Sequence, residues 1–200
     1  LNKDGSENTI AVQVTNKQPS SRWYSGSGIY RDVTLSYRDK VQVAENGNHI
    51  TTPKLAEQKD GNVESQIQSK IKNTAKTLAK VFVEQQIFTK EGKAVSDLVR
   101  SVTKNLSGNE TADFKQTILV NKPTLWTTKS YHPQLYVLKT KVYNEGQLVD
   151  VTEDTFGYRY FNWTAKEGFS LNGERMKFHG VSIHHDNGAL GAEENYKATY

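Results

Sequence analysis

Apolar and polar residues alternate with a period of two through most of this sequence, and this feature limits its fold more than any other. Near the start of the chain, Ile10, Val12 and Val14 alternate with Ala, Gln and Thr, and a longer alternating stretch covers residues 63–88. The Lys, Gln and Ala of that stretch also suit a helix, but its apolar residues do not recur every 3.6 positions. The pattern predicts half-buried β-strands, with one face towards a core and the other towards solvent.

Turn sequences separate the alternating runs. They are Asp60-Gly61-Asn62, Glu91-Gly92, Glu145-Gly146 and Asn172-Gly173, and each combines residues that favour tight turns. From about residue 40 to residue 157 such signals recur at the spacing of a β-sandwich with about seven short strands. We therefore expect a mainly β fold built around a sandwich.

Composition excludes several classes of protein. The chain carries 26 Lys and Arg against 22 Asp and Glu, a net charge of +4, and its lysines are scattered from Lys3 to Lys197. Because nucleic-acid binders concentrate their basic residues, we expect no nucleic-acid partner. No apolar run approaches the roughly 18 residues that a membrane span needs. The absence of Cys excludes disulfides, thiol catalysis and thiolate metal sites.

The string from Gly168 to Asp186 carries the strongest chemical signal. Its residues predict a hairpin closed by Asn172-Gly173, followed by an apolar strand that delivers His184, His185 and Asp186 to its C-terminal end. In α/β barrels that end of a strand faces the substrate. A surface cluster after an edge strand is the alternative. A shared metal ion is disfavoured, because adjacent His residues point to opposite faces of a strand, and we expect no metal site in this chain.

Three separated motifs resemble glycoside hydrolase family 2, and particularly its large bacterial β-galactosidases. The first covers residues 8–35, including the aromatic and Gly-rich run 22–31. The second joins Pro123-Thr124-Leu125-Trp126 to Pro133-Gln134-Leu135-Tyr136 and resembles late strands of the family's immunoglobulin-like domain, so we expect strands there. The third is the string from Gly168 to Asp186. The resemblance implies three parts: the end of a jelly-roll sugar-binding domain (1–38), an immunoglobulin-like β-sandwich (39–157), and the truncated start of a TIM-barrel catalytic domain (158–200).

The resemblance also implies an activity, that of a retaining exo-β-galactosidase that hydrolyses terminal non-reducing β-D-galactosides. His184 matches a histidine that contacts substrate and stabilises the transition state, and Asp186 matches an aspartate that binds sugar hydroxyls. The acid/base and nucleophile glutamates of the family are expected beyond Tyr200, so the chain alone is predicted to be inactive. Glu193-Glu194 lacks the Asn that precedes the family's acid/base, and we interpret this pair as solvated surface.

Other implications of the resemblance concern partners and alternatives. The first motif has Ser20-Ser21 where β-galactosidases carry an acidic residue, which argues against a contact from this part to the galactose 6-hydroxyl.

The chain lacks an initiator Met and any terminal stop pattern, so we expect a piece of a longer protein whose missing barrel is its main packing partner. No cofactor is expected here, although Na⁺ or Mg²⁺ could belong to the full-length enzyme, and secretion or the bacterial cell surface is favoured over the cytoplasm. The alternatives are β-glucuronidase, β-mannosidase, and a non-catalytic carbohydrate-binding or adhesion module.

Overall fold

Two antiparallel sheets form the main body of the protein. The computed structural model describes residues 5–15, 17, 28–29, 33–129 and 133–182. Two compact units divide the chain, Tyr37–Phe178 being one and Leu1–Ser36 with His179–Tyr200 the other. All the described strands belong to the first unit. The divisions that we predicted between residues 38 and 39 and between residues 157 and 158 stay predictions.

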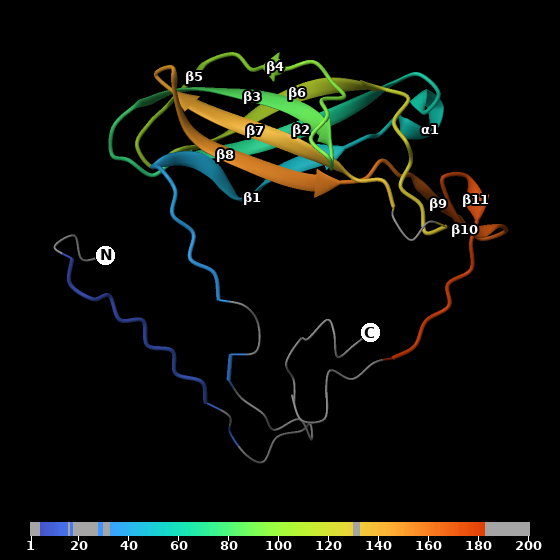
Figure 1. Cartoon of the computed structure of the whole chain (residues 1–200), viewed down its shortest axis with the longest axis horizontal. Helices are drawn as coiled ribbons and strands as arrows, with labels where there is room; N and C mark the ends of the chain where they lie inside the picture. Colours follow the sequence, from blue (N-terminus) through green and yellow to red (C-terminus); the bar gives the residue numbers. More distant parts are fainter. Residues whose placement is uncertain (1–4, 16, 18–27, 30–32, 130–132, 183–200) are drawn as a thin grey trace. The chain divides into compact units, whose positions relative to one another are not determined.

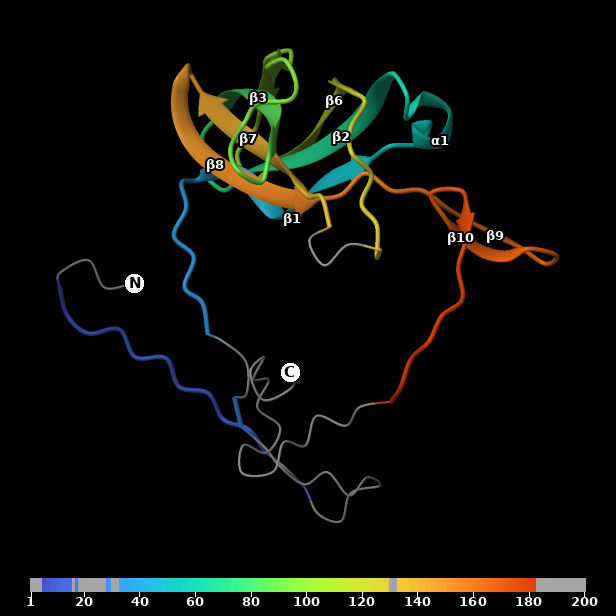
Figure 2. The same cartoon turned by 45° about the vertical axis from the view of Figure 1, so that its right-hand side comes forward.

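The sandwich is built from eight strands and one short helix, α1 (Leu55–Gln58). One sheet has the order β1-β2-β6 and the other β4-β3-β7-β8, with β5 also paired to β3, and the two sheets face each other (Figures 1 and 2). This order matches strands A-B-E and C-F-G of the immunoglobulin fold, so the predicted β-sandwich is confirmed. The bounds are β1 (Val41–Thr51), β2 (Asn62–Asn73), β3 (Ala79–Thr89), β4 (Val99–Arg100), β5 (Lys104–Leu106), β6 (Thr111–Asn121), β7 (Tyr136–Asn144) and β8 (Gln147–Phe156).

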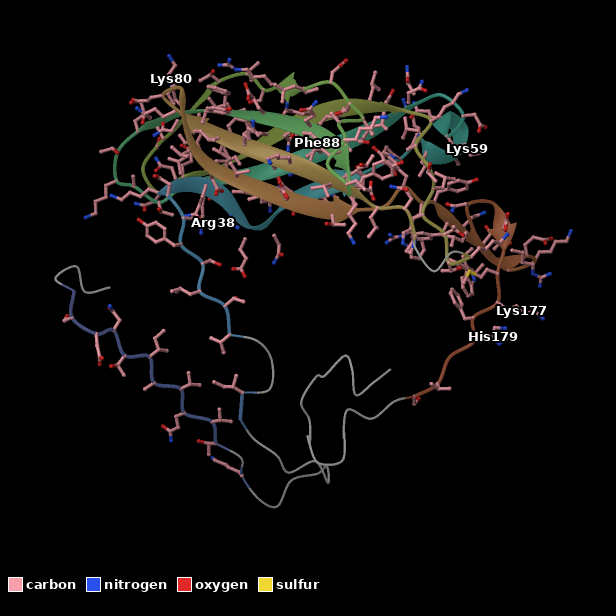
Figure 3. The ribbon with its side chains drawn as sticks, viewed as in Figure 1. Arg38, Lys59, Lys80, Phe88, Lys177 and His179 are labelled. Atoms are coloured by element: carbon pink, nitrogen blue, oxygen red, sulfur yellow. The ribbon has the colours of Figure 1, made fainter. Side chains whose placement is uncertain are left out.

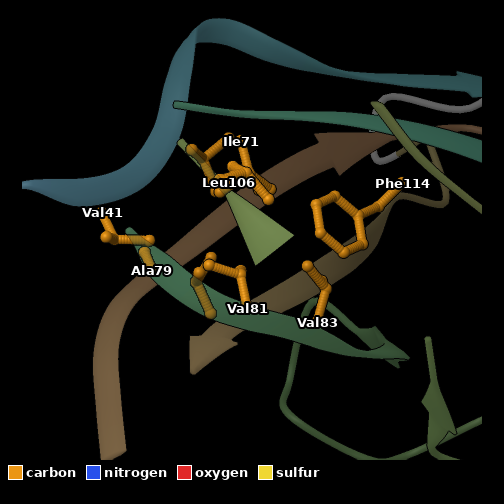
Figure 4. Packing of buried hydrophobic residues seen from close by; sticks show 9 residues of the cluster. Val41, Ile71, Ala79, Val81, Val83, Leu106 and Phe114 are labelled. Carbon is orange, nitrogen blue, oxygen red and sulfur yellow. The ribbon is translucent and has the colours of Figure 1, made fainter. Parts of the chain in front are cut away.

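Alternation along the strands produces two apolar clusters between the sheets. On β2 every second residue from Val63 to Asn73 is buried, which confirms the strands predicted over residues 63–88. The first cluster, drawn in Figure 4, contains Val41, Val43, Ile71, Ala79, Val81, Val83, Leu106, Phe114 and Val142. The second contains Leu55, Val63, Ile67, Ile87, Ile118, Val120, Tyr136, Leu138 and Tyr158. Buried polar side chains, among them Ser69, Gln85 and Thr140, occupy the layer between the two.

Turn geometry follows the predicted turn residues. Glu145 and Gly146 have φ values of 51° and 83° and join β7 directly to β8, as a two-residue type I′ turn does. Asp60-Gly61 instead joins α1 to β2, and α1 is anchored by the fully buried Leu55. No helix in the described part of the chain is long and apolar enough to cross a membrane.

Two local expectations are wrong. The alternating residues Ile10, Val12 and Val14 form no strand and are between 50% and 83% exposed, because a strand is stable only when its backbone pairs with another. The motif segments 123–126 and 133–135 are loops, since β6 ends at Asn121 and β7 begins at Tyr136. Both segments begin with Pro, which has no N–H to donate to a sheet.

Candidate functional site at the junction of sandwich and hairpin

A small hairpin follows the sandwich and precedes the predicted substrate-binding residues in the sequence. It consists of β9 (Phe161–Thr164), β10 (Gly168–Leu171) and β11 (Glu174–Arg175), in the order β11-β10-β9. The predicted closure by Asn172-Gly173 is confirmed by pairing of Leu171 with Glu174. The apolar strand expected next is wrong for residues 176–182, which form no strand. A barrel strand needs paired neighbours on both sides, and in the described structure the Met176 N–H bonds only the Phe169 carbonyl of β10, at 3.0 Å, without extending the sheet.

The predicted site residues themselves lie outside the described residues. This applies to His184, His185 and Asp186, and also to Glu193-Glu194. Lys177 and His179, which follow the hairpin, are labelled in Figure 3. The structure therefore describes the part of the chain that precedes the predicted site, from the aromatic end of the sandwich to the hairpin.

Three aromatic rings close the end of the sandwich from which the hairpin departs. The Tyr158 ring lies edge-on to Tyr136 and Phe156, with centroids 4.9 and 5.2 Å away. Its hydroxyl is 2.8 Å from the Ser65 hydroxyl. Burial raises the pKa of the Tyr158 phenol above its ordinary value, and the Ser65 contact opposes this only partly. The Tyr136 hydroxyl accepts a hydrogen bond from the Thr124 N–H at 2.9 Å, which ties the loop after β6 to the same cluster.

Trp126 fastens that loop to the segment between β8 and β9. Its backbone N–H donates to the Tyr158 carbonyl at 2.8 Å, and the Arg159 guanidinium lies 5.2 Å from the centre of its ring. Gly157 passes so close that an added Cβ would stand 2.9 Å from the Trp126 Cβ. Only a residue without a side chain fits there, so the contact between loop and segment depends on Gly157.

Asn172 fastens the hairpin to both of these segments. Its side-chain Nδ2 donates to the Trp126 carbonyl at 2.8 Å, and its Oδ1 accepts from the Tyr160 N–H at 3.2 Å. Its own N–H donates to the Tyr160 carbonyl at 2.8 Å. Asn tolerates the positive φ of 52° that the turn requires. We call Trp126, Gly157 and Asn172 the junction, because together they set the direction in which the chain leaves the sandwich.

One face of the hairpin exposes large aromatic side chains. Phe161, Trp163 and Phe178 are 64–68% exposed. Phe169 lies among them, with its ring centroid 4.6 Å from Phe178 and 5.9 Å from Trp163. Exposed apolar clusters of this kind mark surfaces that contact another protein segment, a membrane or a ligand.

A shallow groove of about 460 Å³ runs beside the junction. Lys129 and Glu174 form an ion pair across it, and both side chains are mostly exposed. No group of three His, Asp or Glu residues within the described ranges could hold a metal ion. The hydrogen bonds of the junction hold the loop after β6, the segment between β8 and β9, and the hairpin together. The groove is lined by Lys59, Asp60, Pro123, Leu125, Thr127, Lys129, Leu171, Asn172 and Glu174.

Sequence reasoning identified the parts of this junction without their connection. It placed Trp126 in a family motif and Asn172 in a turn, but it did not predict that the two bond to each other. Gly157 received no role. No local pattern carries this information, because 46 residues separate Trp126 from Asn172.

Comparisons with known proteins agree on one family. The model for glycosyl hydrolases family 2 matches residues 45–159. A β-galactosidase from Bacteroides ovatus is 37% identical over 192 residues, which cover 96% of this chain and 22% of that protein. A putative β-glucuronidase from Formosa agariphila is 34% identical over 186 residues, covering 92% of this chain and 16% of that protein.

A solved structure gives the same result. The crystal structure of a glycosyl hydrolase family 2 member from Bacteroides cellulosilyticus superposes with a TM-score of 0.78 and 32% identity, covering 88% of this chain and 23% of that one. The chain thus spans about a fifth of the length of the relatives that it matches.

Proposed function

Because the chain belongs to the glycosyl hydrolases family 2, we propose that the whole protein is a retaining exo-β-galactosidase acting on terminal β-D-galactosides. The observation that carries this proposal is the 37% identity to the β-galactosidase of Bacteroides ovatus along 96% of the chain. The second candidate is a β-glucuronidase, which the 34% identity to the Formosa agariphila protein favours.

The proposed reaction needs two carboxylates about 5 Å apart, one to protonate the glycosidic oxygen and one to attack the anomeric carbon. We expect both beyond Tyr200. Within the chain, His184 donates a hydrogen bond to a sugar hydroxyl that tightens in the transition state, and Asp186 accepts bonds from sugar hydroxyls. The chain thus contributes one edge of the substrate site and the scaffold behind it.

The junction supports this role by orienting the segment that carries His184. Asn172 stands 12 positions before His184 in the sequence, and it is held at both ends of its amide by Trp126 and Tyr160. A substrate-contacting residue must be held close to its productive position, and sites held by rigid elements achieve this better than free loops. Asn172 and Trp126 are therefore positioning residues in our proposal.

The barrel of the same protein is the proposed packing partner. The aromatic face formed by Phe161, Trp163 and Phe178 supplies an apolar surface for it. These rings are about two-thirds exposed within the described structure, and large exposed apolar groups are favourable once another segment buries them.

The test compares three substrates on the full-length protein. The nitrophenyl β-galactoside should have a kcat/KM at least about 100-fold above those of the β-glucuronide and β-mannoside, because a site that binds the galactose hydroxyls rejects sugars that leave its polar groups unpaired. A preference for the β-glucuronide would establish the second candidate instead. Binding of galactosides without turnover of any substrate would favour a carbohydrate-binding module.

The 200-residue chain alone should show no turnover, and activity that follows the purified chain would contradict the placement of both carboxylates beyond Tyr200.

A further inference from the structure

A line of side-chain hydrogen bonds crosses the sandwich in the layer between the two apolar clusters. The Gln85 Nε2 on β3 donates to the hydroxyl oxygens of Ser69 on β2 and Thr140 on β7, both at 2.9 Å. The Ser69 hydroxyl donates to the Asn48 Oδ1 on β1 at 2.5 Å. The Asn48 Nδ2 donates to the Asp154 carboxylate on β8 at 2.7 Å.

The chemistry of these groups sets the direction of every bond in the line. An ionised carboxylate only accepts, so Asn48 must turn its NH₂ towards Asp154 and its carbonyl oxygen towards Ser69. The single hydrogen of the Ser69 hydroxyl is then committed to Asn48. Ser69 can therefore only accept from Gln85, which must present its NH₂. The Gln85 Oε1 is left pointing away from both hydroxyls.

Three buried polar atoms remain without a partner among the described residues. They are the Gln85 Oε1 and both amide atoms of Gln116. Gln85 is fully buried and Gln116 is 8% exposed. Native proteins rarely leave such atoms unpaired, and internal water is the usual partner when protein groups do not reach them.

Strand register places Gln116 one inward position along β6 from the level of Gln85. Gln116 on β6 stands opposite Ile67 on β2, and the next inward residue of β6, Phe114, stands opposite Ser69, the partner of Gln85. Gln116 and Gln85 thus face the space between the sheets from opposite sides. Because β6 is the edge strand of its sheet, water can enter beside Gln116.

We propose that this layer is a binding site for internal water, in which one water molecule donates to the Gln85 Oε1 and accepts from the Gln116 Nε2. The bound water extends the line of hydrogen bonds from β6 through β3, β2 and β1 to β8. Hydrogen bonds that connect five strands fix the pairing register of those strands. A shift of one strand by one residue would turn an amide out of this layer and leave its partners unpaired.

Water-to-amide NOE spectroscopy on the ¹⁵N-labelled chain tests the site without any substitution. The Gln116 side-chain amide protons should show cross-peaks to water with the sign of a long-lived complex. Gln66, one residue before Ile67 on the exposed outer face of β2, is the matched control and should show only the sign of fast surface hydration. Identical signals from Gln116 and Gln66 would overturn the proposal, as would a high-resolution crystal structure with a direct bond between the Gln85 and Gln116 amides.

Substitution then tests whether both amides share the water. In a Gln116→Leu variant the long-lived cross-peak at the Gln85 side-chain amide should be lost, while the signals of Gln66 stay unchanged. Persistence of the Gln85 cross-peak at full intensity would contradict a shared site. If the variant does not fold, the measurement on the unsubstituted chain still decides the proposal.

Discussion

Phe114 in the sandwich is 1% exposed and Trp163 in the hairpin is 67% exposed, although both are aromatic residues on antiparallel strands of alternating sequence. Phe114 has a second sheet opposite it, against which it packs with Val83 and Val142. Trp163 belongs to a single three-stranded layer, and its ring contacts are with neighbours on the hairpin and the segment after it. Burial therefore depends on a second layer. We expect the sandwich to be stable by itself, whereas the aromatic face of the hairpin has no second layer among the described residues.

The largest expected difference is between two substitutions in the 200-residue chain, each of which removes one aromatic ring, from the sandwich in one case and from the hairpin in the other. Phe114→Ala should lower the free energy of unfolding by about 3–5 kcal/mol, because it leaves a cavity between the sheets. Trp163→Ala should change it by no more than about 0.5 kcal/mol, as exposed substitutions do. Urea denaturation measures both. Equal losses would mean that the hairpin has a core of its own.

The second prediction separates stability from chemistry in the full-length enzyme. His184→Ala should lower kcat/KM by about 10²–10³-fold, the effect of removing one positioned hydrogen-bond donor to the transition state. His185→Ala should cost far less, since adjacent strand residues face opposite sides, and Asp186→Ala should resemble His184→Ala. Steady-state kinetics with a nitrophenyl β-galactoside, together with melting temperatures, checks this. Full activity in His184→Ala with loss in His185→Ala would show that the two faces of the strand are reversed.

A third experiment loosens the connection between the two regions. Asn172→Ala removes the side-chain bonds to the Trp126 carbonyl and the Tyr160 N–H and places Ala at a positive φ of 52°, which together should cost about 1–3 kcal/mol of local stability. Amide hydrogen exchange should speed up over residues 160–178 and stay unchanged in β2 and β3. Asn162→Ala is the control, because the Asn162 side chain bonds to the adjacent Trp163 N–H. Uniformly faster exchange in Asn172→Ala would mean that the junction also stabilises the sandwich.

The smallest expected effect is a pH dependence that belongs to the sandwich. Burial raises the pKa of Tyr158, so the folded state favours the neutral phenol more than the unfolded state does. This contribution to stability is fully present below the unfolded pKa of about 10 and is lost as pH rises above it towards the folded pKa. Urea denaturation between about pH 8 and 11 should therefore show a steeper loss in the unsubstituted chain than in Tyr158→Phe. Tyr37→Phe, at a side chain that is 93% exposed, should leave the slope unchanged.

Sequence-based prediction succeeded for the strands of the sandwich and for the tight turns, and it failed for segments that form no strand in the described structure. The strands over residues 63–88 were predicted correctly because their alternation and their partners lie in one sandwich. The turns at Glu145-Gly146 and Asn172-Gly173 were also predicted, because a positive φ is a local property of those residues. Residues 10–14 and 176–182 were expected to be strands and are not, since alternation predicts which face would be buried but cannot supply a neighbouring strand.

By itself, the sequence determined the β class, the positions of the tight turns and the family. These properties depend on residues close together in the chain, or on motifs that can be compared directly with relatives. Only the tertiary structure decided that Asn172 reaches the Trp126 carbonyl and that the Gln85 amide is oriented by Ser69 and Asn48. These contacts join separate strands and loops, and the hydrogen-bonding capacity of a side chain is assigned only when its neighbours in space are known. The physical reason is that a hydrogen bond requires two groups at a set distance and direction, which the order of residues does not specify.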